Sequence, residues 1–184
     1  MMKQILISMA LAFATVAAFS QNIPAGMRME LAEVEQDNFG YSVFSYLDED
    51  GTFGYYMSIS CEIPLLEIFR DDIKDASFNH FDETCLWMGS TADEASAFLD
   101  SLMYMFDEEN GTIRQFPCRM TFGADALAGS STATCIVVKR FLQAKRLCFQ
   151  FGSGSRTAQA DLTKSALKSV RWSFGVGRKL HPDW

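Results

Sequence analysis

The sequence predicts an α+β protein: a mainly antiparallel sheet of about six to seven strands, with two amphipathic helices packed on one face. Three observations lead to this prediction. Several short apolar runs alternate with a period of two and are separated by turn residues, as is typical of strands. Two segments carry apolar residues at helical spacing instead. Strands come in groups rather than alternating one by one with helices, which favours an antiparallel sheet.

The first 20 residues are predicted to be a cleaved secretory signal peptide. Lys3 gives a positive start, residues 5–19 are almost wholly apolar, and Ala18 and Ser20 are the small residues that a signal peptidase requires. The apolar run is shorter than the roughly 20 residues of a membrane-spanning helix, and no later segment approaches that length. We therefore expect residues 21–184 to form one domain outside the cytoplasm, either periplasmic or secreted.

Strands dominate the first part of the predicted domain. Residues 53–61 alternate between apolar and small or polar side chains, and they follow an apolar run at 41–47 across the turn Asp48–Gly51. This pattern predicts a hairpin. An earlier strand at 27–35 is expected to join it through residues 37–40. Further strands are expected at 84–88, 112–122, 131–140 and 145–151, the last two forming a second hairpin, whereas 63–81 is either a short helical turn or a loop.

The first helix is expected from Thr91 to about Asp107. Thr91 and Glu94 have the spacing of a capping box, in which each side chain accepts a hydrogen bond from a free N–H of the first turn. Apolar residues fall on one side of this helix, while Asp93 and Asp100 lie with Asp107 on the opposite side. Asn110-Gly111 is expected to end the segment.

The second helix is expected to begin near Thr157, with Ser155 or Thr157 as its N-cap, after the Gly/Ser-rich residues 152–155. Apolar residues recur at every fourth position from Leu162 to Phe174. Residues 170–176 also alternate as a strand would, but a helix closed by Gly175 in the left-handed conformation is preferred.

Charge is distributed very unevenly along the chain. Residues 21–110 contain 20 acidic side chains against three basic ones, a net charge of −17, whereas residues 111–184 contain 12 basic side chains against three acidic ones, a net charge of +9. Such asymmetry can indicate an anionic partner for the basic half. The favoured interpretation is that the halves match each other, with the basic flank of the second helix beside acidic residues of the first. The residues expected to supply these acids are Asp93, Asp100, Asp107 and Glu108.

The alternative is an anion site on the second helix. A glycine loop before a helix N-terminus can present N–H groups to an anion. The loop lacks the third glycine of a dinucleotide-binding motif and the Gly-Lys-Ser/Thr of a phosphate-binding loop. The candidate binding residues are Arg156, Lys164, Lys168 and Arg171.

No motif for catalysis, a metal or a cofactor is apparent. His80 and His181 are the two histidines; His80 lies close to Asp82 and Glu83, but a metal site there would need further ligands from elsewhere in the chain, and His181 is less constrained still. The five cysteines contain no CxxC pair and lie in apolar, strand-like surroundings, so buried thiols are preferred to a disulfide framework.

Three functional hypotheses follow. The leading one is a non-catalytic interaction module that binds a protein, peptide or glycan through an open strand face or edge. The second is a small extracytoplasmic hydrolase that uses carboxylates or His80. The third is an anion or membrane-surface binder that works through the basic C-terminal helix. A nucleic-acid partner is not expected, because the compartment is wrong and the basic residues are not interleaved with exposed aromatic side chains.

Overall fold

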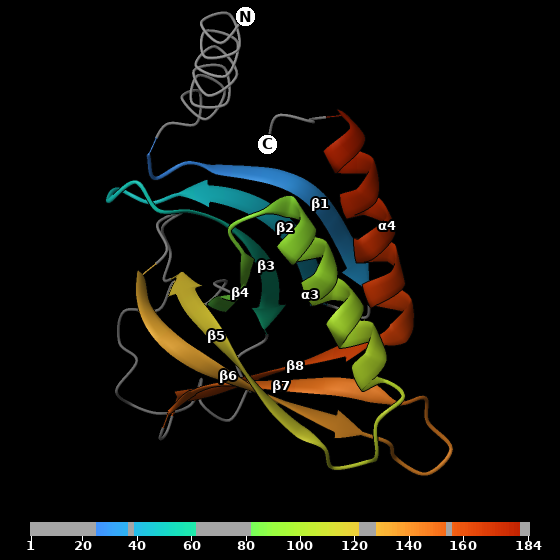
Figure 1. Cartoon of the computed structure of the whole chain (residues 1–184). Helices are drawn as coiled ribbons and strands as arrows, with labels where there is room; N and C mark the ends of the chain where they lie inside the picture. The colour runs from blue at the N-terminus through green and yellow to red at the C-terminus, as the bar shows by residue number, and fades with distance from the viewer. Residues whose placement is uncertain (1–24, 37–38, 62–81, 122–127, 154–155, 181–184) are drawn as a thin grey trace, which may run out of the picture.

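The computed structural model describes residues 25–36, 39–61, 82–121, 128–153 and 156–180 (Figure 1). This part of the chain contains eight strands and two helices. In chain order they are β1 (Arg28–Gln36), β2 (Phe39–Leu47), β3 (Phe53–Cys61), β4 (Asp82–Gly89), α3 (Ala92–Met105), β5 (Ile113–Thr121), β6 (Ala128–Val138), β7 (Arg146–Ser153), β8 (Arg156–Thr163) and α4 (Lys164–Leu180).

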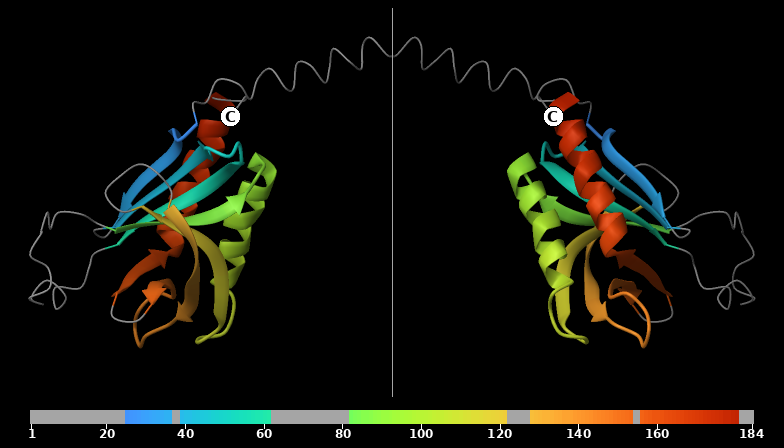
Figure 2. Two further views of the ribbon diagram at one scale, coloured as in Figure 1. Left: turned by 90° about the vertical axis from the view of Figure 1, so that its left-hand side faces the viewer. Right: turned by 90° about the vertical axis from the view of Figure 1, so that its right-hand side faces the viewer.

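All eight strands belong to one antiparallel sheet, in which each strand pairs with its neighbours in sequence. The sheet is strongly curled, so that β8 approaches the strands at the opposite end (Figures 1 and 2). The Tyr41 hydroxyl of β2 donates a hydrogen bond of 2.6 Å to the Asp161 carbonyl of β8. The predicted α+β class with an antiparallel sheet is confirmed, but the predicted count of six to seven strands is too low.

The additional strand is β8, which was predicted to be the start of the second helix. Ala160 and Leu162 are buried and pair with Phe149 and Leu147 of β7, so this segment alternates with a period of two. The helix begins only at Lys164. The expected start near Thr157, and with it the Ser155 or Thr157 cap, is therefore wrong. The prediction was misled because apolar residues recur at every fourth position from Leu162 onwards. Leu162 is a buried residue of the strand, and the later residues of the series are buried residues of the helix.

Thr163 caps α4 in place of the predicted residues. Its hydroxyl accepts a hydrogen bond of 3.1 Å from the Ala166 N–H, which satisfies one free donor of the first turn. The helix then continues through Gly175 to Leu180, so residues 170–176 are helical and the expected termination at Gly175 is wrong.

The close packing of α4 against β1 requires a glycine at position 177. A Cβ atom on Gly177 would lie 2.2 Å from the Leu31 carbonyl oxygen of β1. The helix and the strand therefore approach so closely that no other residue fits without a shift of the backbone. A Cβ on Gly175 would meet nothing within 4 Å.

Helix α3 follows its prediction closely. The Thr91 hydroxyl accepts from the Glu94 N–H at 3.2 Å, and the Glu94 carboxylate accepts from the Thr91 N–H at 3.1 Å, which confirms the capping box. The helix ends at Met105, slightly before the expected position, and Gly111 with φ of 89° lies in the turn that follows.

The two predicted hairpins are also present. Strand β3 has the predicted bounds, and it joins β2 through a turn in which Gly51 has φ of 84°. Phe39 and Gly40, expected in the first turn, already pair with β1. The segment 63–81 lies outside the described residues.

Apolar side chains fill both faces of the first strands. One large cluster contains buried residues of the sheet together with Leu99 and Leu102 of α3 and Val170 and Phe174 of α4, so both helices pack against the same cluster. A smaller cluster on the strands contains Phe44, Tyr46, Tyr56 and Cys85, with Trp87 packed against it.

Candidate functional site

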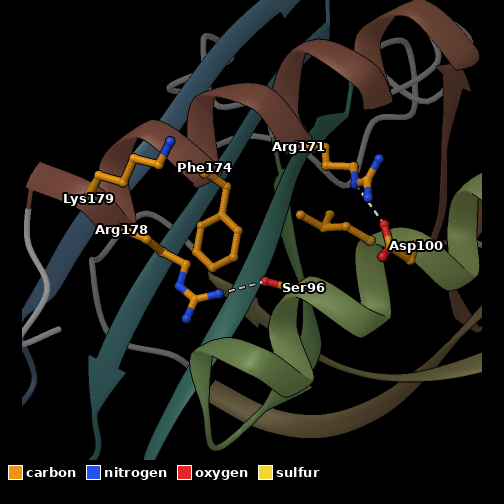
Figure 3. A pocket seen from close by; sticks show the side chains of 8 residues that line it. Ser96, Asp100, Arg171, Phe174, Arg178 and Lys179 are labelled. Atoms are coloured by element: carbon orange, nitrogen blue, oxygen red, sulfur yellow. Dashed lines mark hydrogen bonds and ion pairs between the residues drawn. The ribbon is translucent and has the colours of Figure 1, made fainter.

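Helices α3 and α4 run antiparallel and are joined by a regular series of ion pairs. Three pairs, which we call the interhelical ladder, connect acidic residues of α3 and its C-terminal turn to basic residues of α4 (one of them is drawn in Figure 3). The three acids are spaced seven residues apart, and so are the three basic residues. Seven residues make about two helical turns, so each set of side chains lies in one row along its helix. The pairs are Arg178–Asp93 at 3.0 Å, Arg171–Asp100 at 2.6 Å and Lys164–Asp107 at 3.2 Å.

The ladder confirms the predicted matching of the two helices. Lys164 and Arg171 contact Asp107 and Asp100, as expected from the acidic row on the first helix. Arg178 was not predicted. The sequence carried the signal, because Arg178 follows Arg171 at the same seven-residue interval that separates the aspartates.

The remaining residues of the predicted anion site lie elsewhere. Lys168 lines a second cleft with Glu33 and Trp172, between α4 and β1. Arg156 is the first residue of β8, whereas α4 follows the last residue of that strand. The four candidate residues are thus divided among the ladder, this second cleft and the far end of β8. Glu108, expected in the pairing, contacts Arg114 instead.

A shallow cleft of about 390 Å³ lies along the ladder (Figure 3). Leu99 and Phe174 line it with apolar surface, and Arg171 and Arg178 approach it from α4. Ser96 supplies the hydroxyl of the cleft, but this hydroxyl donates to the Ala92 carbonyl at 2.9 Å and accepts from Arg178 at 3.0 Å. Among the residues that the structure describes, the hydroxyl's hydrogen-bond partners are thus a carbonyl and a guanidinium, and neither acts as a general base.

The connection between β6 and β7 exposes apolar side chains to an unusual degree. Phe141 and Leu142 are each 91 % exposed, more than any other large apolar residue of the described chain. The Gln143 N–H donates to the Arg140 carbonyl at 3.1 Å, so the chain turns sharply at these two residues. We call residues 139–144 the hairpin tip. It projects from the end of the molecule at which α3 terminates (Figures 1 and 2).

The base of this hairpin is held firmly against the turn between α3 and β5. The Lys139 N–H donates to the Asn110 side-chain oxygen at 2.7 Å, and the Gly111 N–H donates to the Val137 carbonyl at 2.8 Å. The Lys145 ammonium donates to the Glu108 carbonyl. The apolar tip is therefore presented by a well-supported base.

Four cysteines whose side chains the structure describes are thiols without a disulfide. Cys85, Cys118 and Cys135 are buried and Cys148 is partly buried. Burial raises the pKa of the Cys135 thiol to about 12, and burial together with the nearby Asp161 carboxylate raises the pKa of Cys148 to about 11. Such thiols remain protonated near neutral pH and are poor nucleophiles.

Within the described residues, no group of three or more histidine, cysteine, aspartate or glutamate side chains is placed to hold a metal ion. His80 and His181 lie outside that part. No helix of the described chain has the length and apolar character needed to cross a bilayer. Comparison with protein-family models, with curated proteins and with solved structures finds no match for this chain.

Proposed function

We propose that this protein is an extracytoplasmic, non-catalytic binding module and that the hairpin tip is its contact surface. The observation that carries the proposal is the exposure of Phe141 and Leu142, each 91 %, at the apex of a tightly supported turn. Exposed apolar side chains at such a position cost solubility and are typical of interaction sites.

The backbone of the tip supports the same proposal. Leu142 has φ of 61°, the left-handed region that glycine or asparagine usually occupies. A bulky residue in this conformation is strained, and strained residues cluster at functional sites. A glycine would make the turn more easily, so the presence of leucine supports a role for its side chain beyond the turn itself.

The chemistry of the described residues favours binding over catalysis. Neither described hydrogen-bond partner of the Ser96 hydroxyl is a general base, and burial raises the pKa of the Cys118, Cys135 and Cys148 thiols. The basic residues of α4 that were candidates for anion binding, Lys164 and Arg171, already have aspartate partners. The contact surface is therefore assigned to the hairpin tip rather than to α4.

Photo-crosslinking tests the proposal. A photoreactive phenylalanine analogue replaces Phe141 in the full chain, and in a matched control it replaces Trp172, another exposed aromatic residue on α4. Each protein is irradiated in its native extracytoplasmic fraction. We expect adducts at position 141 well above those at position 172. Equal or lower labelling at position 141 would refute the assignment of the tip as the contact surface.

A further inference from the structure

We propose that the partner of the hairpin tip is an anionic membrane surface. Phe141 and Leu142 would enter the boundary between headgroups and acyl chains, while Lys139 and Arg140 contact lipid phosphates. This inference rests on the proposed function, because it uses the same contact surface and adds the chemistry of the partner.

The charge of the hairpin is the first argument. Residues 139–146 contain four basic side chains and no acidic one. Lys145 and Arg146 have internal partners, the Glu108 carbonyl and the Asp161 carboxylate. Among the described residues, no carboxylate forms an ion pair with Lys139 or Arg140, and both are exposed. The two cations nearest the apolar apex are thus available to an external anion.

The shape of the tip is the second argument. The connection between β6 and β7 projects from the sheet as a narrow turn (Figures 1 and 2), and its two apolar side chains are each 91 % exposed. A protein partner would need a matching apolar pocket rimmed by acids. The interface of an anionic bilayer provides an apolar layer beneath a continuous sheet of phosphates, which suits apolar side chains flanked by cations.

The surroundings of the tip set the docking orientation. At the adjoining turn, Asp107 and Glu108 are neutralised by Lys164 and Arg114. Because the predicted mature chain, residues 21–184, has a net charge of −8, an anionic membrane repels the molecule as a whole. The tip is therefore the part that approaches first. Glu109, exposed on the same turn, opposes deeper insertion.

Co-sedimentation with vesicles tests this inference on the mature protein. One set of vesicles is an equimolar mixture of phosphatidylglycerol and phosphatidylcholine, and the other is phosphatidylcholine alone. We expect binding to the anionic vesicles that weakens as salt rises, and much weaker binding to the neutral ones. Inorganic phosphate at millimolar concentration is added as a competitor, and it should not displace the protein, because the apolar contacts require a bilayer.

Paired variants identify the residues responsible. Replacing Lys139 and Arg140 with Gln should weaken binding to anionic vesicles by about 30-fold, since each cation near such a surface contributes about fivefold. Replacing Phe141 and Leu142 with Ser should weaken it by at least about tenfold. All four side chains are exposed, so the thermal midpoint should change little.

Two matched variants serve as controls. Lys179→Gln removes an exposed cation of α4, and Trp172→Ser removes an exposed aromatic side chain of the same helix; both should bind as the unmodified protein does. Equal binding to the two kinds of vesicle, or unchanged binding of the tip variants, would overturn the membrane assignment. If crosslinking at position 141 then captured a protein, the tip would remain a contact surface with a different partner.

Discussion

Reversal of charge in the interhelical ladder tests how α3 and α4 are held together. The central pair is the most suitable, because the Arg171 Nε atom lies 2.6 Å from the Asp100 carboxylate and both side chains are about half exposed, at 56 % and 41 %. An exposed ion pair contributes about 0.2–1 kcal/mol. Arg171→Glu replaces this attraction with a repulsion, so we expect the free energy of unfolding to fall by about 1–2 kcal/mol.

Reversing the charge of Asp100 as well should restore part of the lost stability. In a cycle of Arg171→Glu, Asp100→Arg and the double variant, we expect a favourable coupling of about 0.5–1 kcal/mol, measured by urea unfolding in low salt. The thermal midpoint should show the same pattern, since about 1 kcal/mol corresponds to about 2–4 °C for a domain of this size.

The control combines Arg171→Glu with Asp93→Arg. Asp93 is the next acid of the ladder, seven residues or roughly 10 Å away along α3, and Arg178 is its partner. This cycle should give a coupling near zero. In 1 M salt, where screening shortens to about 3 Å, the coupling between positions 171 and 100 should also shrink. A coupling that is absent at low salt, or the same for both acids, would refute the residue-by-residue pairing.

Two further predictions concern packing and titration of the folded protein, and a third concerns processing of the chain. Gly177→Ala should lower the free energy of unfolding by about 1–2 kcal/mol in chemical denaturation, because overpacking against the β1 carbonyl exceeds the gain in helix propensity. Gly175→Ala should raise the free energy of unfolding by up to about 1 kcal/mol, since its Cβ meets no neighbour. A loss of stability for Gly175→Ala would indicate that the helix ends there. Stability should fall as the pH rises from the ordinary thiol value of 9.0 towards about 12, because the folded protein retains the Cys135 proton that the unfolded chain releases. The slope in a pH series of denaturation curves should reach about 1.4 kcal/mol per pH unit for this thiol and should be shallower in Cys135→Ala. Finally, intact-mass measurement should find that the secreted protein begins at Gln21, and a chain that retained residues 1–20 would contradict the proposed compartment.

Local signals in the sequence predicted much of the fold. The capping box at Thr91 and the alternation of residues 53–61 depend on neighbours within a few positions, so both could be identified without the structure. Strand β8 could not, because its conformation depends on pairing with β7 across a short connection. The Leu162 side chain fits either a helix face or a strand face, and the tertiary contact decides between them.

The sequence predicted the interhelical ladder better than the hairpin tip. The pairing of the helices followed from the regular spacing of the aspartates on α3, whereas Lys168, another candidate of the anion site, lines the second cleft. The hairpin tip was not singled out at all. Phe141 and Leu142 read as ordinary apolar residues beside a strand, and only the completed fold reveals that nothing in the described chain covers them.

We propose two roles for the cations: those of the ladder hold α4 against α3, and those of the hairpin tip contact an external anionic surface. Hydrogen exchange of backbone amides, measured with and without phosphatidylglycerol-containing vesicles, tests this claim directly. We predict that the vesicles slow exchange within residues 139–146 and leave α4 unchanged beyond its first turn. Protection of residues 168–180 with none at the tip would contradict this division of roles and would assign the anionic contact to the helix.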